Sequence, residues 1–145
     1  RGRPVYGLIR NTGQVQSESW LPMATGRCNS ANLNGLVVSR QVGLSQVNGG
    51  WSPNAVVQRE RWSNGSVEGI ALSSYGGDNE SVRYSGALSL SPKSCWGTIQ
   101  ETDQSGRTYN YSALIVNGRR SKGARGYLYL QRDPADLTVG WLVRD

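Results

Sequence analysis

Aromatic and cationic side chains gather in one stretch of the sequence, NGGWSPNAVVQRERW, which runs from Asn48 to Trp62. Proteins hold sugars with aromatic rings that stack on C–H faces and with polar side chains that bond the hydroxyls, and arginine forks add affinity for anionic sugars. In a strand, Trp62 shares a face with polar side chains, which is unusual for a core tryptophan. The stretch therefore predicts a ligand-binding surface made of Trp51, Asn54, Arg59, Arg61, Trp62 and Asn64. The alternative is that both rings cover the end of a barrel.

A second cationic group lies in NGRRSKGARG, from Asn117 to Gly126. A run of this kind can attract sulfated or phosphorylated polymers. The alternative is a solvated hairpin tip. We predict that this run forms a loop that binds an anionic ligand, the anionic-ligand loop, through Arg119, Arg120, Lys122 and Arg125.

The sequence contains no histidine, which removes the usual general base and the commonest metal ligand. We expect no metal, no cofactor and no catalytic residues. The surviving enzymatic alternative is a glycosidase with two carboxylates, of which Glu60 or Glu101 would be one. Glu60 stands between two arginines, which we expect to hold it ionised, the wrong state for a general acid. The other acidic candidates are Glu68, Glu80 and Asp103.

The chain has 16 Lys+Arg against 10 Asp+Glu, a formal net charge of +6. This charge favours an acidic partner, either a glycan or a host-surface receptor, and an anionic polysaccharide is a further candidate. The alternative is that the charge only keeps the protein in solution. Nucleic acid ranks third, because the aromatic residues are not concentrated beside the basic loop.

Length and cysteine content bound the architecture. At 145 residues we expect one domain over 1–145, and the start without methionine predicts a processed chain or a fragment. Cys28 and Cys95 are either a long-range disulfide or two buried thiols. No apolar run is long enough for a membrane span.

Turn residues and alternating runs predict strands throughout. Asn-Gly, the strongest short hairpin signature, occurs at Asn34, Asn48, Asn64 and Asn117. We expect an all-β fold of about eight or nine antiparallel strands with little or no helix, in a sandwich or a barrel, jelly-roll-like or meander. The segment from Asn11 to Asn34 is the least regular and is expected to be a loop.

Alternation also predicts which side chains point inward. Tyr84 and Leu88 are expected on the inner face of the strand from Val82 to Ser91. In the last strand we expect the apolar row inward, which consists of Leu137, Val139, Trp141 and Val143. In YLYL the tyrosines and leucines cannot all point inward, so an aromatic row is expected at the surface or at a subunit contact.

Two stretches, NLNGLVVSRQVGLS (Asn32 to Ser45) and GALSLSP (Gly86 to Pro92), resemble the short strands of the terminal head domains of viral and phage fibres. The resemblance implies a compact β-sandwich head without catalysis, usually trimeric, that recognises a host glycan or protein on the virion surface or outside the cell. An alternative to such an attachment domain is a stand-alone secreted lectin or carbohydrate-binding module. A further alternative is a structural subunit of a capsid or appendage.

Overall fold

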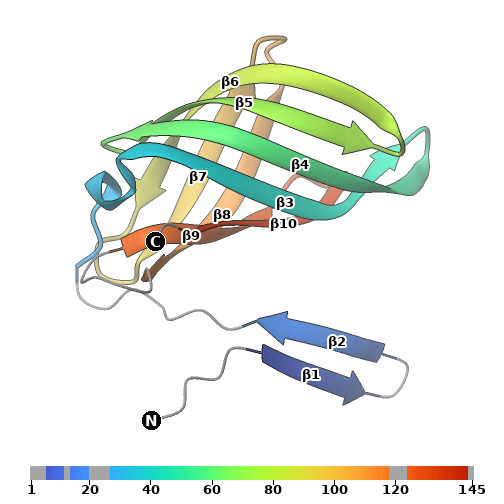
Figure 1. Cartoon of the computed structure of the whole chain (residues 1–145), viewed down its shortest axis with the longest axis horizontal. Coiled ribbons are helices and arrows are strands. Elements are labelled where there is room, and N and C mark those ends of the chain that lie inside the picture. The colour runs from blue at the N-terminus through green and yellow to red at the C-terminus, as the bar shows by residue number, and fades with distance from the viewer. Residues whose placement is uncertain (1–5, 12–13, 20–26, 118–123, 144–145) are drawn as a thin grey trace.

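Eight strands form a closed antiparallel barrel in the computed structural model, which describes residues 6–11, 14–19, 27–117 and 124–143 (Figure 1). The strand order around the barrel is β10-β3-β4-β5-β6-β7-β8-β9, so each strand pairs with its sequence neighbour and β10 closes the ring on β3. The all-β prediction is confirmed, and of the candidate topologies the structure has the meander. The barrel strands are β3 (Gly35–Val47), β4 (Gly50–Ser63), β5 (Ser66–Tyr75), β6 (Asp78–Leu90), β7 (Trp96–Asp103), β8 (Thr108–Asn117), β9 (Ala124–Gln131) and β10 (Asp136–Val143).

A separate two-stranded sheet precedes the barrel, formed by β1 (Tyr6–Asn11) and β2 (Gln14–Ser19), and Figure 1 shows it apart from the barrel. A 3₁₀ turn, η1 (Ser30–Leu33), follows, and Asn29 caps its start with a side chain that accepts a hydrogen bond from the Ala31 amide. The expectation of a loop from Asn11 to Asn34 was therefore wrong for β2 and η1.

Two Asn-Gly pairs make the hairpin turns that the sequence predicts. Asn48 and Gly49 join β3 to β4 with φ of 51° and 80°, and Asn64 and Gly65 join β4 to β5 with φ of 49° and 91°. Positive φ at both central residues gives the turn whose twist matches the flanking strands. Asn34 instead ends η1 and leads directly into β3.

The barrel is closed at one end by η1 (Figure 1). Leu33 of η1 is buried there in the same apolar cluster as Trp62, Ile115 and Leu142. The Cys28–Cys95 disulfide, with Cα atoms 5.3 Å apart, ties the segment before η1 to the start of β7. Of the two alternatives for Cys28 and Cys95, the structure therefore has the disulfide and not two buried thiols.

The interior of the barrel combines an aliphatic cluster with tyrosine rings and polar side chains, and further aliphatic side chains lie on its outside. Tyr84 and Leu88 point inward as predicted. Tyr127 and Tyr129 also point inward, and Leu130 of the same strand is 51% exposed, so the prediction of a surface aromatic row was wrong.

The inward row of β10 was also predicted wrongly. Leu137 is 60% exposed and Val139 47% exposed, whereas Thr138 and Leu142 are buried. An eight-stranded barrel has an interior only wide enough for side chains to fill. Here tyrosine rings bonded to interior polar groups take up part of that space, and on β10 Thr138 points inward in place of Leu137 and Val139.

Glycines make room for two of these rings. A Cβ at Gly69 would lie 2.3 Å from the Tyr84 ring, and one at Gly140 would lie 2.2 Å from the Tyr129 ring. Each tyrosine therefore lies flat across a neighbouring strand, with its hydroxyl in the barrel interior. Glycine therefore stands at the positions where a tyrosine ring packs so closely on the neighbouring strand that a Cβ would not fit.

Candidate functional site

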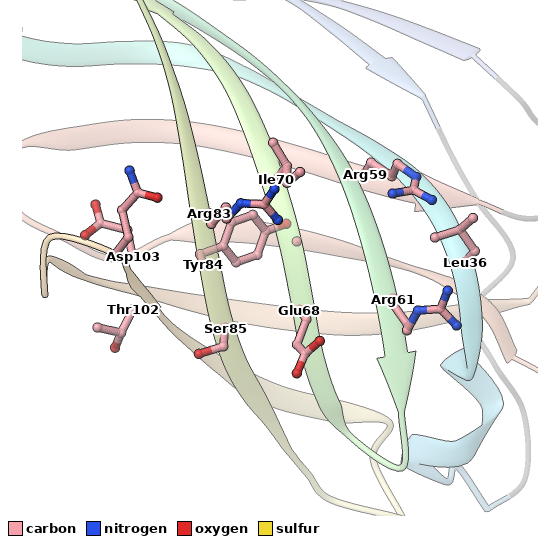
Figure 2. Close-up of a pocket in the computed structure, with 12 residues that line it drawn as sticks. Leu36, Arg59, Arg61, Glu68, Ile70, Arg83, Tyr84, Ser85, Thr102 and Asp103 are labelled. Carbon is pink, nitrogen blue, oxygen red and sulfur yellow. The ribbon is translucent and has the colours of Figure 1, made fainter.

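A groove of about 450 Å³ runs over the outside of the barrel between β3 and β7. Three arginines lie in it: Arg59 and Arg61 on β4 and Arg83 on β6. Figure 2 shows the β4 pair extending toward β3, and Arg83 extending toward Ile70 on β5. All three side chains are exposed. The groove is therefore a cationic surface open to solvent.

Strand register sets the spacing of these arginines. Arg59 and Arg61 are two residues apart on the outer face, or about 7 Å at the usual rise of a strand. Arg59 pairs with Ile70, and Ile70 pairs with Arg83, so Arg59 and Arg83 lie in one row two strands apart, about 10 Å. Rigid paired strands thus hold three guanidinium groups within reach of one extended ligand.

Two acidic residues line the same groove. Glu68 is exposed and lies directly opposite Arg61 in the register. Asp103 accepts hydrogen bonds from the Ser105 and Arg107 amides at 2.8 Å and 3.0 Å and from the Tyr109 hydroxyl at 3.0 Å. Burial alone would raise the pKa of Asp103, but the hydrogen bond from the Ser105 hydroxyl at 2.6 Å, together with these donors, outweighs it and lowers the pKa. Asp103 is thus engaged in holding the β7–β8 turn.

The predicted ligand-binding set does not form one surface. Arg59 and Arg61 point outward as proposed, but Trp62 is only 2% exposed and its indole donates a 2.6 Å hydrogen bond to Glu60 inside the barrel. Asn54 is also buried and donates to Thr138 at 2.8 Å. Placing Trp62 and Asn54 on a binding surface was wrong, because the polar face of β4 is the face that lines the barrel.

Trp51 and Asn64 lie at opposite ends of β4. Trp51 is 48% exposed. It lies eight residues before Arg59 on the strand, about 27 Å away at the usual rise, so the two cannot share one compact site. Asn64 is in the β4–β5 turn, where its side chain accepts a 3.2 Å hydrogen bond from Asn34. Neither residue lines the arginine groove.

The predicted anionic-ligand loop falls largely outside the described residues. Arg119, Arg120 and Lys122 are not among them, and Arg125 is described only as part of β9. Their contribution to a site stays a prediction.

Both candidate glutamates of the enzymatic alternative lie in the barrel interior. Glu60 accepts hydrogen bonds from Ser39 at 2.5 Å, from Trp62 at 2.6 Å and from Tyr127 at 2.9 Å. These partners give both oxygens of the Glu60 carboxyl group hydrogen bonds inside the barrel. The expectation that neighbouring arginines hold Glu60 was wrong, since alternation sends those arginines to the outer face.

Glu101 has a different environment inside the same barrel. Burial raises its pKa to about 8, repulsion from Glu60 adds to the rise, and a hydrogen bond with Tyr111 opposes it. Glu101 therefore carries a proton at neutral pH.

Arg83 is the groove residue that the sequence reasoning did not include. Alternation along β6 places it on the wet face, opposite Tyr84. That it lies in the same row as Arg59 depends on the pairing of β4, β5 and β6. Such pairing is set by the turns and by which faces are buried, so it follows only once the fold is known.

No cluster of three or more metal-binding side chains occurs among the residues that the structure describes. Within the same residues, no helix has the length and apolar character needed to cross a bilayer.

Comparison with known proteins gives no significant match to any protein family, to any curated protein or to any solved structure.

Proposed function

We propose that the protein is a non-enzymatic attachment domain that binds an anionic glycan or another acidic cell-surface ligand in the groove of Arg59, Arg61 and Arg83. The supporting observation is the row of exposed guanidinium groups on rigid, paired strands. Arginine matches carboxylates and sulfates with two parallel hydrogen bonds, and strands that are already ordered reduce the entropy lost on binding. The proposal keeps the arginines of the predicted surface and replaces its tryptophans with Arg83.

Replacing the groove arginines tests this proposal. We expect Arg59→Ala and Arg83→Ala each to weaken binding of a sulfated oligosaccharide by about threefold to tenfold, the range for exposed charged contacts. Arg59→Lys should restore only part of the affinity, because lysine keeps the charge but not the fork. Surface plasmon resonance at two salt concentrations measures both effects.

The matched control is Arg132→Ala, which removes one exposed positive charge outside the groove lining. Equal losses in Arg132→Ala and the groove variants would mean that net charge alone attracts the ligand. That result would remove the proposed site.

The buried glutamates are the observation that favours a glycosidase as the second candidate. A carboxylate beside a protonated carboxylic acid is the acid–base division that such enzymes use. However, the cavity that Glu101 lines is only about 20 Å³. That space holds one water-sized group and not a sugar ring, which supports the non-enzymatic proposal.

We also propose that the protein assembles as a homo-oligomer, with a trimer favoured by the resemblance to fibre heads. Exposed aliphatic side chains adjoin one another across β9, β10 and β3: Val139 pairs with both Leu130 and Val42, and Leu137 pairs with Leu44. An exposed patch of this kind is typical of an interface. A structural subunit of a capsid or appendage would share this property.

Light scattering of the purified protein tests the assembly. We expect a mass that is a multiple of the chain mass, and Leu137→Glu should shift it toward the monomer because a charge would be buried at the contact. A strict monomer at high concentration would contradict the assembly but would leave the arginine groove untouched.

A further inference from the structure

The barrel interior contains a small cavity that the arginine groove does not use. Its volume is about 20 Å³, and it lies among the inward side chains nearer the end opposite η1. Four tyrosines, three glutamines and two glutamates are among its lining residues, so it is rich in oxygen atoms and aromatic faces. A cavity of this size accepts one water-sized polar group when partners are present.

Two buried polar atoms on side chains that line this cavity have no hydrogen-bond partner among the described residues. They are Oε1 of Gln41 and the hydroxyl of Tyr84, and their side chains are only 5% and 7% exposed. A buried polar group without a partner is destabilising, so a ligand that satisfies it gains binding energy. Gln41 Oε1 can only accept, so the group that it lacks is a donor.

The cavity adjoins a wider mouth of about 440 Å³ at the open end of the barrel. Tyr75 and Glu80 line both spaces, so the two spaces adjoin at these residues. The hairpins of this end form the mouth. Its charged lining residues are Asp78, Glu80, Asp136 and Arg107.

The charge of this mouth opposes that of the whole chain. Three carboxylates stand against one arginine in a protein whose formal net charge is +6. Arg107 is also drawn over the Tyr109 ring, 5.3 Å from its centre. Local acidic charge around a narrow opening concentrates cations there.

We propose that the open end of the barrel binds a small organic ammonium ion, with its ammonium group in the inner cavity and its chain in the mouth. An ammonium is about the size of a water molecule and has only donors, which suits Gln41 Oε1 and the tyrosine oxygens. The rings of Tyr84 and Tyr111 attract a cation through their faces. Glu80 and Asp78 favour a second positive charge at the mouth.

Glu101 couples this binding to pH. It lines the cavity and has a pKa of about 8, so below that pH it is a neutral acid and above it an anion that attracts the ammonium. The titratable groups that interact with Glu101 from the surrounding strands are Glu60 on β4, Tyr84 on β6, Tyr111 on β8, and Tyr127 and Tyr129 on β9. Burial raises the pKa of each of these tyrosines, so they stay neutral between about pH 7 and about pH 9, the range in which Glu101 changes charge.

Calorimetric titration with 1,4-diaminobutane tests the proposal, with 1,4-butanediol as the uncharged probe of the same length. We expect the diamine to bind and the diol not to, and the diamine affinity to rise by about tenfold between about pH 7 and about pH 9. Glu101→Gln should abolish that rise. Glu80→Gln, at an exposed position, should weaken binding by about threefold to tenfold while leaving the rise in place.

The matched control is Glu68→Gln, which makes the same charge change in the outer groove, away from the mouth. Equal binding of diol and diamine would overturn the proposal, as would absence of diamine binding. If Glu101→Gln fails to fold, Glu80→Gln provides the test. A diamine affinity equal to that of Glu68→Gln would then overturn the proposed site. Because oligosaccharide binding is measured at the arginine groove, failure here is distinguishable from failure of the proposed function.

Discussion

Glu101→Gln is expected to stabilise the protein at pH 8 by an amount on the order of a few kcal/mol and to remove a fall in stability between about pH 5 and about pH 8. Burial, followed by the charge of Glu60, raises the pKa of Glu101 from 4.5 to about 8. Between these values the unfolded chain releases a proton that the folded chain retains. The free energy of unfolding therefore decreases as pH rises through this window and is constant with respect to Glu101 above it.

Urea unfolding at a series of pH values measures this effect. The wild type should show the downward slope, and the glutamine variant should show it only to the extent that other groups contribute. Glu68→Gln provides an exposed control, for which the slope of the wild type should persist. A slope that survives in Glu101→Gln would mean that this carboxyl is not buried in the folded protein.

Loss of the disulfide is expected to cost about 4 kcal/mol, because a link across 67 residues restricts the unfolded chain strongly. In the folded state the bond joins the segment before η1 to β7 and keeps Leu33 over the closed end of the barrel. Cys28→Ala together with Cys95→Ala should therefore lower the urea midpoint. Faster hydrogen exchange should appear first in η1 and around β7.

The wild type under reducing conditions gives the matching measurement without a substitution. It should unfold at the same urea concentration as the double alanine variant once both thiols are shown to be free. An unchanged midpoint in both samples would contradict the role of the bond in stabilising the barrel.

The sequence predicted the alternation of β4 correctly but placed the face of Glu60 and Trp62 at the surface, which was wrong. Glu60 and Trp62 were placed together, and Arg59 and Arg61 opposite them, as the structure has them. Polar side chains suggested a wet face, yet this row lines the barrel, where Ser39 and Tyr127 satisfy Glu60. A pattern of polarity cannot distinguish water from a buried hydrogen-bond network as the source of partners.

The same limit explains why the inward and outward faces of β9 and β10 were predicted wrongly. Tyr129 of β9 and Thr138 of β10 lie inside, while Leu130 and Val139 lie outside. Local features were more reliable: the turns at Asn48 and Asn64 depend on backbone conformation alone and were predicted correctly. The arginine row could not be predicted from such local features, because it depends on the register between strands. That register is set by the turns and by the buried faces together.

The most direct test of the arginine groove is a two-dimensional NMR titration with a sulfated oligosaccharide, because it locates the ligand without a substitution. The account predicts that the largest amide shifts occur at Arg59, Ile70 and Arg83, with Trp51 and the barrel mouth unaffected. Shifts confined to residues 119–125, or to the exposed ring of Trp51, would place the acidic ligand elsewhere and contradict it.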